Sequence, residues 1–236
     1  MFDQINKLVL SSVAAIIAWY VIQSIPKPIT PVPVPVIIKP HRPFREAKIG
    51  GDSAPDGTQV QIDLPQELRI KNVGGRDGAG LCVFTSINHA GIWANEPILI
   101  DFQKWMRSKP GGGYPSKVDK MIVQKCKEAN VPVPEYIQIE GKDLELLNLA
   151  CKTGRMPSVT YGFSPSGRYG GQRISHMVSL VHADKKNYAV LDNNYIEALE
   201  WLTHEEFQKS YMTDGGWSVI LLHPGPPPVP HNRRFS

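Results

Sequence analysis

The first of the chain's three cysteines, Cys82, follows the glycine-rich stretch GGRDGAGL and precedes an apolar segment with helical spacing. A thiol in the first turn of a helix lies near unpaired amides and the positive end of the helix dipole, which favour a thiolate. Gly78 and Gly80 would let the backbone pass close to the group that the sulfur attacks. The pattern predicts a nucleophilic cysteine, and a cysteine buried in a core helix is the alternative.

A candidate base lies farther along the chain. His176 begins the apolar run HMVSLV, which is typical of a central strand, and Asp192 and Asn193 follow the next apolar run, NYAVL. A short turn between the two strands would place these polar groups beside the histidine, where one of them could accept from the ring and orient it. Strand alternation puts Asp192 and Asn193 on opposite faces, so that one of them faces the ring. A histidine satisfied within the core is the alternative for His176.

The surrounding periodicity predicts an α+β domain. Apolar positions at helical spacing predict helices over residues 82–94, 116–130, 142–154 and 203–211. Alternating or continuous apolar runs predict strands over residues 136–140, 156–163, 176–183, 186–194 and 217–222. Helices that precede a set of hairpin-connected strands indicate an antiparallel sheet that is covered by helices.

These segments resemble the papain-like cysteine peptidases, in which a cysteine opens a helix after a glycine-rich loop and a histidine and an Asn or Asp follow. The resemblance rests on GAGLCVF and HMVSLVHADKKNYAVLDNN, and it covers residues 74–222. LELLNLACKTGRMPSVTY and WLTHEEFQKSY are similar to bacterial members related to the double-glycine-leader peptidases. The resemblance implies the papain-like fold, with Cys82 as the nucleophile and His176 as the general base and then the acid.

The resemblance leaves the third residue open. The Asn-Ser-Trp region of papain favours Asn193, whereas the leader-peptidase pattern of an Asp after an apolar strand favours Asp192. We prefer Asn193 narrowly and keep Asp192 as the alternative.

The oxyanion donor departs from the family pattern. Papain-like enzymes carry a glutamine six positions before the cysteine, and here Arg76 occupies that position and is followed by Asp77. Arginine can donate hydrogen bonds, but it is longer and carries a charge that Asp77 would neutralise. We expect Arg76 and the Cys82 amide to be the oxyanion donors, with Asn72 as another donor or a degenerate site as alternatives.

The sequence thus predicts a papain-like thiol hydrolase that cleaves a peptide or isopeptide bond in a peptide or protein substrate through a Cys acyl-enzyme. An acyltransferase or transglutaminase-like enzyme with the same triad is one alternative, and a catalytically inactive binding or structural module is another. The glycine-rich, basic segments 106–117 and 162–173 would suit an extended or acidic substrate. The sequence does not determine the oligomeric state.

Composition argues against other classes of protein. The net charge of +4 is nearly balanced, and no basic helix interleaved with aromatic residues indicates a nucleic-acid partner. We see no phosphate loop, dinucleotide fingerprint or metal-ligand spacing, and we therefore expect no cofactor and no metal. Cys126 and Cys151 lie on apolar faces of predicted helices, where unpaired cysteines commonly act as small hydrophobes.

The flanks predict a membrane tether. Residues 1–25 contain Leu8–Ile25, a segment without charge or proline that is long enough to cross a bilayer. A signal peptide and a core helix are the alternatives. We expect residues 26–51 to be a proline-rich linker, 52–222 the peptidase domain and 223–236 a proline-rich disordered tail. The protein would then be a single-pass membrane-anchored protein, with the side of the membrane undetermined.

Overall fold

The structure is a computed structural model that describes residues 48–51 and 53–223. Its elements in chain order are β1 (Lys48–Gly50), η1 (Gln66–Leu68), α2 (Cys82–Trp93), α3 (Phe102–Met106), α4 (Pro115–Ala129), β2 (Tyr136–Glu140), α5 (Leu144–Lys152), β3 (Ser158–Tyr161), β4 (His176–Ala183), β5 (Asn187–Leu191), β6 (Leu199–Thr203), α6 (His204–Met212) and β7 (Trp217–Leu221).

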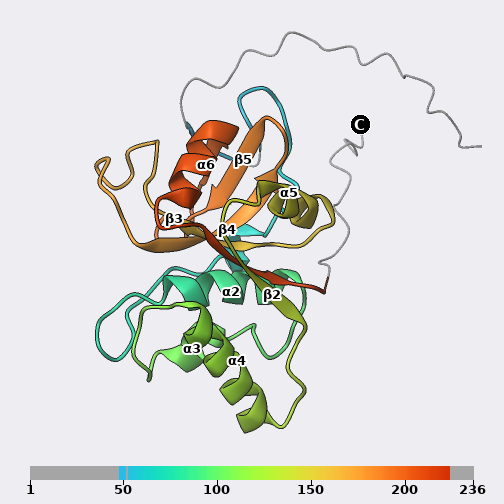
Figure 1. The fold of residues 1–236 in the computed structure, drawn as a ribbon, viewed down its shortest axis with the longest axis vertical. Helices are drawn as coiled ribbons and strands as arrows, with labels where there is room; N and C mark the ends of the chain where they lie inside the picture. The colour runs from blue at the N-terminus through green and yellow to red at the C-terminus, as the bar shows by residue number, and fades with distance from the viewer. Residues whose placement is uncertain (1–47, 52, 224–236) are drawn as a thin grey trace, which may run out of the picture. The chain divides into compact units, whose positions relative to one another are not determined.

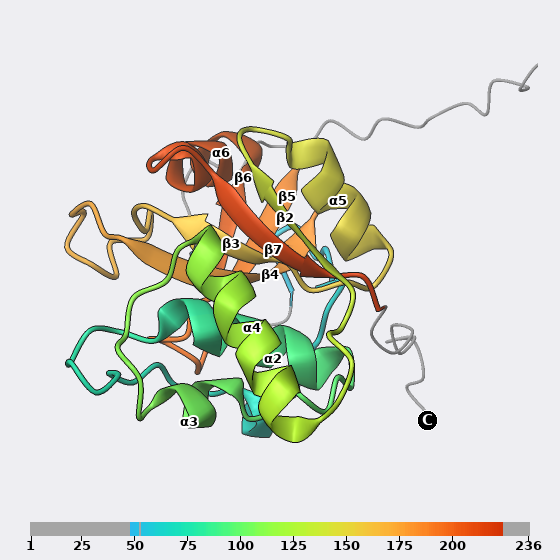
Figure 2. The same cartoon turned by 60° about the horizontal axis from the view of Figure 1, so that its bottom comes forward.

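The strands form one seven-stranded sheet in the order β1-β6-β5-β4-β3-β7-β2, with antiparallel pairing between neighbours. Three helices, α2, α3 and α4, lie on one side of this sheet, and α5 and α6 lie on the other (Figures 1 and 2). The predicted α+β class with an antiparallel sheet is confirmed. Two strands were not predicted: β6, and β1, which pairs with β6 and falls within the expected linker 26–51.

Helix α2 is buried along nearly its whole length, between the sheet and the other helices of its side, and this burial holds its first residue, Cys82, in place. Polar side chains on α2 also find partners on β4. Ser86 Oγ donates to the Met177 carbonyl over 3.0 Å, and His89 Nδ1 lies 3.1 Å from Ser179 Oγ. Because buried polar groups must be paired, these contacts set the position of the helix along the strand as well as its distance from the sheet.

Two further expectations concern cysteines and the membrane. Cys126 on α4 and Cys151 on α5 are buried and free, as predicted. Within the part of the chain that the structure describes, no helix is both long and apolar enough to cross a bilayer. The expected anchor Leu8–Ile25, most of the linker and nearly all of the tail lie outside the described residues.

Candidate active site

Cys82 is the first residue of α2, and the loop before it is held in place by backbone contacts. The Leu81 amide donates to the Val73 carbonyl and to Asn72 Oδ1, over 2.9 and 3.0 Å. Leu81 is the N-cap of α2, and no side chain of the cap accepts from the first helical turn. The amides of that turn therefore face the site without a capping group, as a thiolate or an oxyanion requires.

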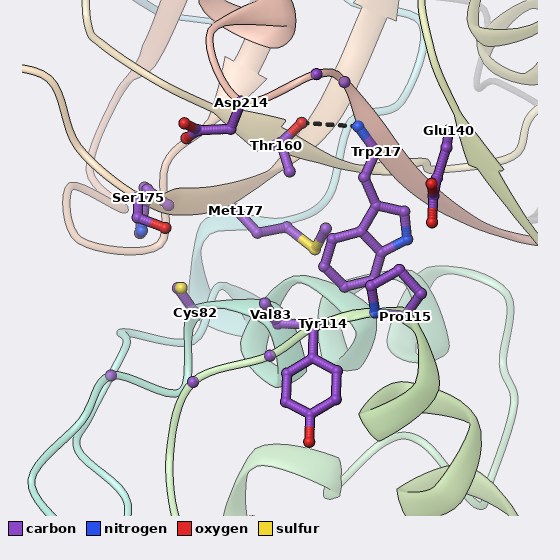
Figure 3. Close-up of a pocket in the computed structure, with 16 residues that line it drawn as sticks. Cys82, Val83, Tyr114, Pro115, Glu140, Thr160, Ser175, Met177, Asp214 and Trp217 are labelled. Atoms are coloured by element: carbon purple, nitrogen blue, oxygen red, sulfur yellow. Dashed lines mark hydrogen bonds between the residues drawn. The ribbon is translucent and has the colours of Figure 1, made fainter.

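A pocket of about 470 Å³ opens beside Cys82 (Figure 3). One wall is the start of α2, a second is the loop through Gly112, Gly113 and Tyr114, and a third comes from β3, β4 and the turn before β7. Gly113 permits this arrangement because a Cβ there would lie 2.5 Å from a methyl carbon of Val83. Any larger residue would push the loop away from the helix and distort the pocket.

His176 is the first residue of β4 and also lines this pocket. Its Nε2 lies 2.9 Å from Oδ1 of Asp192, which follows the last residue of the neighbouring strand β5. Cys82 lines the same pocket, and hydrogen bonding and charge from His176 lower the pKa of its thiol. With Nε2 directed at the carboxylate, Nδ1 is the ring atom left for the sulfur. The structure therefore brings Cys82, His176 and Asp192 together in the order expected of a thiol, a base and an orienting group.

The three groups shift one another's pKa values. Burial alone would raise the pKa of Cys82, but the hydrogen bond and the charge of His176 outweigh it and lower the thiol pKa below its ordinary value. Burial alone would lower the pKa of His176, but hydrogen bonds with Asp192 and Cys82 raise it to about 9. Burial opposes ionisation of Asp192, yet contact with His176 lowers its pKa. Each of these shifts favours the charged form of its group, so the site favours a thiolate–imidazolium pair.

Asn193, which was narrowly preferred as the orienting residue, is not the hydrogen-bond partner of the His176 ring. Its Nδ2 donates to the Cys82 carbonyl at 3.1 Å, and to Ser86 Oγ and the Met177 carbonyl at 2.9 Å each. As the alternation of side chains predicts, the two adjacent residues point in opposite directions. The alternative, Asp192, contacts the ring, and Asn193 instead ties the start of α2 to β4.

Arg76, the expected oxyanion donor, is exposed and does not line the pocket. The loop that carries it closes on itself, with a bridge between Gly74 and Gly80, so six positions along the chain do not bring Arg76 to the sulfur. Asp77 accepts from the amides of Ala79 and Gly111 at 3.2 and 2.7 Å, and it thus holds the loop.

The side chain of Asn72, the alternative donor, forms hydrogen bonds with Leu81 and Asn194. Its Oδ1 accepts from the Leu81 amide and its Nδ2 donates to Asn194 Oδ1 at 3.1 Å. Among the expected donors, Cys82 is the residue that lines the pocket, and its amide lies at the start of α2.

The charged side chains in the pocket lining are His176, Glu140 and Asp214. Figure 3 shows the Glu140 carboxylate near the Trp217 ring and Asp214 on the same side of the pocket as Ser175. Asp214 also forms an ion pair with Arg173. Two carboxylates in the lining do not suit the acidic substrate that the basic loops suggested.

Among residues 48–51 and 53–223, no group of three or more His, Cys, Asp and Glu side chains is arranged to hold a metal ion.

Tyr169 is a site residue that the sequence did not indicate. Its hydroxyl donates to Asp192 Oδ2 over 2.7 Å, and its ring lies 5.9 Å from the His176 ring, measured between centroids. It lies in the glycine-rich, basic segment 162–173, and such segments carry no periodicity from which a structure can be predicted. A single tyrosine between glycines was the one available signal, and it does not specify a partner.

Comparisons with known proteins add little to this geometry. No protein-family model matches the chain, and no curated protein matches it. A solved structure from Bacillus anthracis, described provisionally as a C39-like peptidase, is similar over 72% of this chain and 100% of its own, with 13% identity and a TM-score of 0.44. These values are too low to assign the chain to a family, and membership of the papain-like peptidases stays a prediction.

Proposed function

We propose that this protein is a papain-like thiol hydrolase that cleaves a peptide or isopeptide bond through an acyl-enzyme on Cys82. The observation that supports the proposal most directly is the position of His176, which lines one pocket with Cys82 and lies 2.9 Å from the buried Asp192. A cysteine that served only to fill the core would need neither a histidine partner nor access to a pocket.

The proposed reaction uses the ion pair in two stages. The Cys82 thiolate attacks the substrate carbonyl carbon, and the carbonyl electrons form a tetrahedral oxyanion. When that intermediate collapses, the C–N bond breaks and the His176 imidazolium gives its proton to the leaving amine. Neutral His176 then removes a proton from water, and the hydroxide attacks the thioester. Collapse of the second intermediate releases the acid and the Cys82 thiolate, while His176 keeps the proton.

Asp192 serves this cycle by holding the ring. Its Oδ1 faces Nε2, which fixes the tautomer with Nδ1 toward sulfur and stabilises the imidazolium. The carboxylate is completely buried, so its charge is poorly screened by water.

The oxyanion would be stabilised chiefly by main-chain amides at the start of α2, including that of Cys82. Arg76 does not line the pocket, so it is not placed to act as the glutamine of papain-like enzymes does. Loss of one oxyanion donor costs roughly 100- to 1,000-fold in rate. We therefore propose a slow enzyme.

The lining also bears on the substrate. Glycines 112, 113, 215 and 216 lie along the pocket and leave room for an extended backbone. Glu140 and Asp214 favour a basic substrate side chain over an acidic one. The membrane tether predicted from Leu8–Ile25 would, if present, restrict the enzyme to substrates near a bilayer.

Incubation of the full chain with a complex peptide mixture, followed by acid quenching and mass spectrometry, tests the proposal. We expect cleaved peptides together with an acyl adduct on Cys82, and neither product with Cys82→Ala. Addition of an excess of a primary amine separates hydrolysis from acyl transfer, because a transferase would form amide products in place of acids. An intact mixture with an unmodified Cys82 would contradict the proposal and favour a binding module.

A further inference from the structure

A chain of side-chain hydrogen bonds leads from the residue before Cys82 to the proposed catalytic carboxylate. The Leu81 amide donates to Asn72 Oδ1 at 3.0 Å, and Asn72 Nδ2 donates to Asn194 Oδ1 at 3.1 Å. Asn194 Nδ2 donates to the Tyr169 hydroxyl at 3.0 Å, and that hydroxyl donates to Asp192 Oδ2 at 2.7 Å. The side-chain amides of Asn72 and Asn194 and the Tyr169 hydroxyl each accept one hydrogen bond and donate one in this series.

The chain closes through the triad itself. Asp192 Oδ1 lies 2.9 Å from His176 Nε2, and His176 lines the same pocket as Cys82, whose amide follows Leu81. We call this series, which runs from Leu81, the N-cap of α2, through Asp192 to His176 and ends in the pocket beside Cys82, the polar ring. Such networks fix geometry more strongly than isolated pairs, because one displaced member leaves two others unpaired.

Asp192 depends on this ring because its side chain is completely buried. Its Oδ1 accepts from His176 and from the Asn194 amide, at 2.9 Å each. Its Oδ2 accepts from Tyr169. Without that hydroxyl, one oxygen of a buried anion would lose its donor, and a carboxylate in that state is costly to keep ionised.

We propose that Tyr169 and Asn194 are positioning residues that hold Asp192 ionised and oriented toward His176. This inference rests on the proposed function, because it assigns these residues a purpose in forming the Cys82–His176 ion pair. Tyr169 comes from the loop between β3 and β4, and the triad is therefore complete when this loop is docked on Asp192.

A tyrosine between β5 and β6 that contacts the same loop supplies a matched control. Tyr195 donates its hydroxyl to the Arg168 carbonyl at 2.8 Å, and the Arg168 guanidinium lies over the Tyr195 ring at 5.1 Å. Tyr195 therefore holds the residue next to Tyr169. Tyr169→Phe and Tyr195→Phe each remove one hydroxyl that anchors the loop, but Tyr169→Phe alone removes the donor to Asp192.

The test is the rate of Cys82 alkylation by iodoacetamide between pH 5 and 9, measured on the full chain by site-resolved mass spectrometry. Loss of the Tyr169 hydroxyl raises the pKa of Asp192, because that hydrogen bond lowers it. A protonated Asp192 no longer supports the imidazolium, so the acid limb of the Cys82 profile moves to higher pH. We expect Tyr169→Phe to lower the rate at pH 6 roughly tenfold, and Tyr195→Phe to change it less than about twofold.

Asn194→Ala provides a second variant in case Tyr169→Phe folds poorly. It removes the amide that donates to Tyr169 but keeps the backbone N–H that donates to Asp192, so we expect a smaller shift in the same direction. Profiles of Tyr169→Phe and Asn194→Ala that coincide with that of Tyr195→Phe would overturn the positioning role and leave the proposed function intact. A wild-type Cys82 that is inert below pH 8 would overturn both.

Discussion

Cys82 and Cys151 lie on two helices that pack against the same strand, β4, from opposite sides of the sheet (Figures 1 and 2). Cys151 is fully enclosed, its sulfur is 3.9 Å from the Leu180 carbonyl, and burial raises its pKa. Cys82 begins its helix beside a pocket, and contact with His176 lowers its pKa in spite of burial. One strand therefore packs against a thiol whose pKa is raised, at its middle, and lies beside a thiol whose pKa is lowered, at its first residue.

The difference shows that burial and position on a helix do not by themselves make a thiol reactive. Cys151 lies near the end of α5, against apolar surroundings and a carbonyl, and both disfavour an anion. Cys82 lies at the opposite end of its helix, where the dipole is favourable and a cation is adjacent.

The largest effect that we expect separates these two cysteines in hydrolysis. Cys82→Ala removes the nucleophile and should lower peptide cleavage by about a thousandfold or more. Cys151→Ala removes one buried sulfur and should leave the turnover within about twofold, while it lowers the free energy of unfolding by roughly 1 kcal/mol. Product formation and denaturant unfolding of the two variants measure this contrast. Equal loss of activity would contradict it.

The next effect separates the adjacent residues Asp192 and Asn193. Asp192→Asn should lower hydrolysis about a hundredfold or more, because the ring loses its carboxylate and its fixed tautomer. The alkaline limb of the rate, set by the His176 pKa of about 9, should also move to lower pH, because contact with Asp192 raises that pKa.

Asn193→Ala is the matched variant. It should reduce stability by about 1–3 kcal/mol through the lost contacts to α2 and β4, yet leave the alkaline limb unchanged. The pH dependence of the rate distinguishes the two roles, and an alkaline limb that moved with Asn193 rather than Asp192 would contradict them.

A third comparison concerns two histidines of β4. His176→Ala removes the cation beside Cys82, and alkylation of Cys82 at pH 6 should fall roughly 10- to 100-fold as the thiol returns toward an ordinary pKa. His182 lies near the other end of the strand, 3.3 Å from Asp184, and His182→Ala should leave Cys82 alkylation within about threefold in the folded protein. Circular dichroism verifies folding. A similar loss in both would mean that the effect is structural.

The smallest effect concerns substrate choice. Glu140→Gln removes one of the two carboxylates in the pocket lining and should reduce the preference for basic over acidic side chains about two- to tenfold. Cleavage profiles of peptide pairs that differ by one Lys-to-Glu exchange measure it. No preference in the wild type, or an unchanged one in the variant, would remove Glu140 from substrate recognition.

The sequence predicted the parts of the fold that depend on local patterns. β2 and β4 have the predicted bounds, and α2 begins at Cys82, because apolar periodicity is a property of neighbouring residues. β6 was missed because its apolar run is interrupted by Glu200, a buried carboxylate that accepts from Ser164 and from the Ser166 amide. Hydrogen bonds from a distant segment that compensate for a buried carboxylate leave no pattern in the local sequence.

The site was predicted to the same extent. Cys82 and His176 were chosen from their places at element ends, and the structure places both in one pocket. The choice between Asp192 and Asn193 depends on the register of β5 against β4, which shifts between Leu180 and His182. Arg76 was misplaced because spacing along a chain does not reveal that a loop closes on itself. Tyr169 lies in a loop whose path is set by its contacts with the folded domain.

The most direct measurement is the alkylation of the native full chain by iodoacetamide at pH 6, with the modified cysteines identified by mass spectrometry. A lowered thiol pKa at Cys82 predicts rapid modification there, while Cys126 and Cys151 stay unmodified until the protein is unfolded. If Cys82 were as unreactive as Cys151 at pH 6 and began to react at pH 8 or above, the ion pair with His176 would not exist, and the protein would not be a thiol hydrolase.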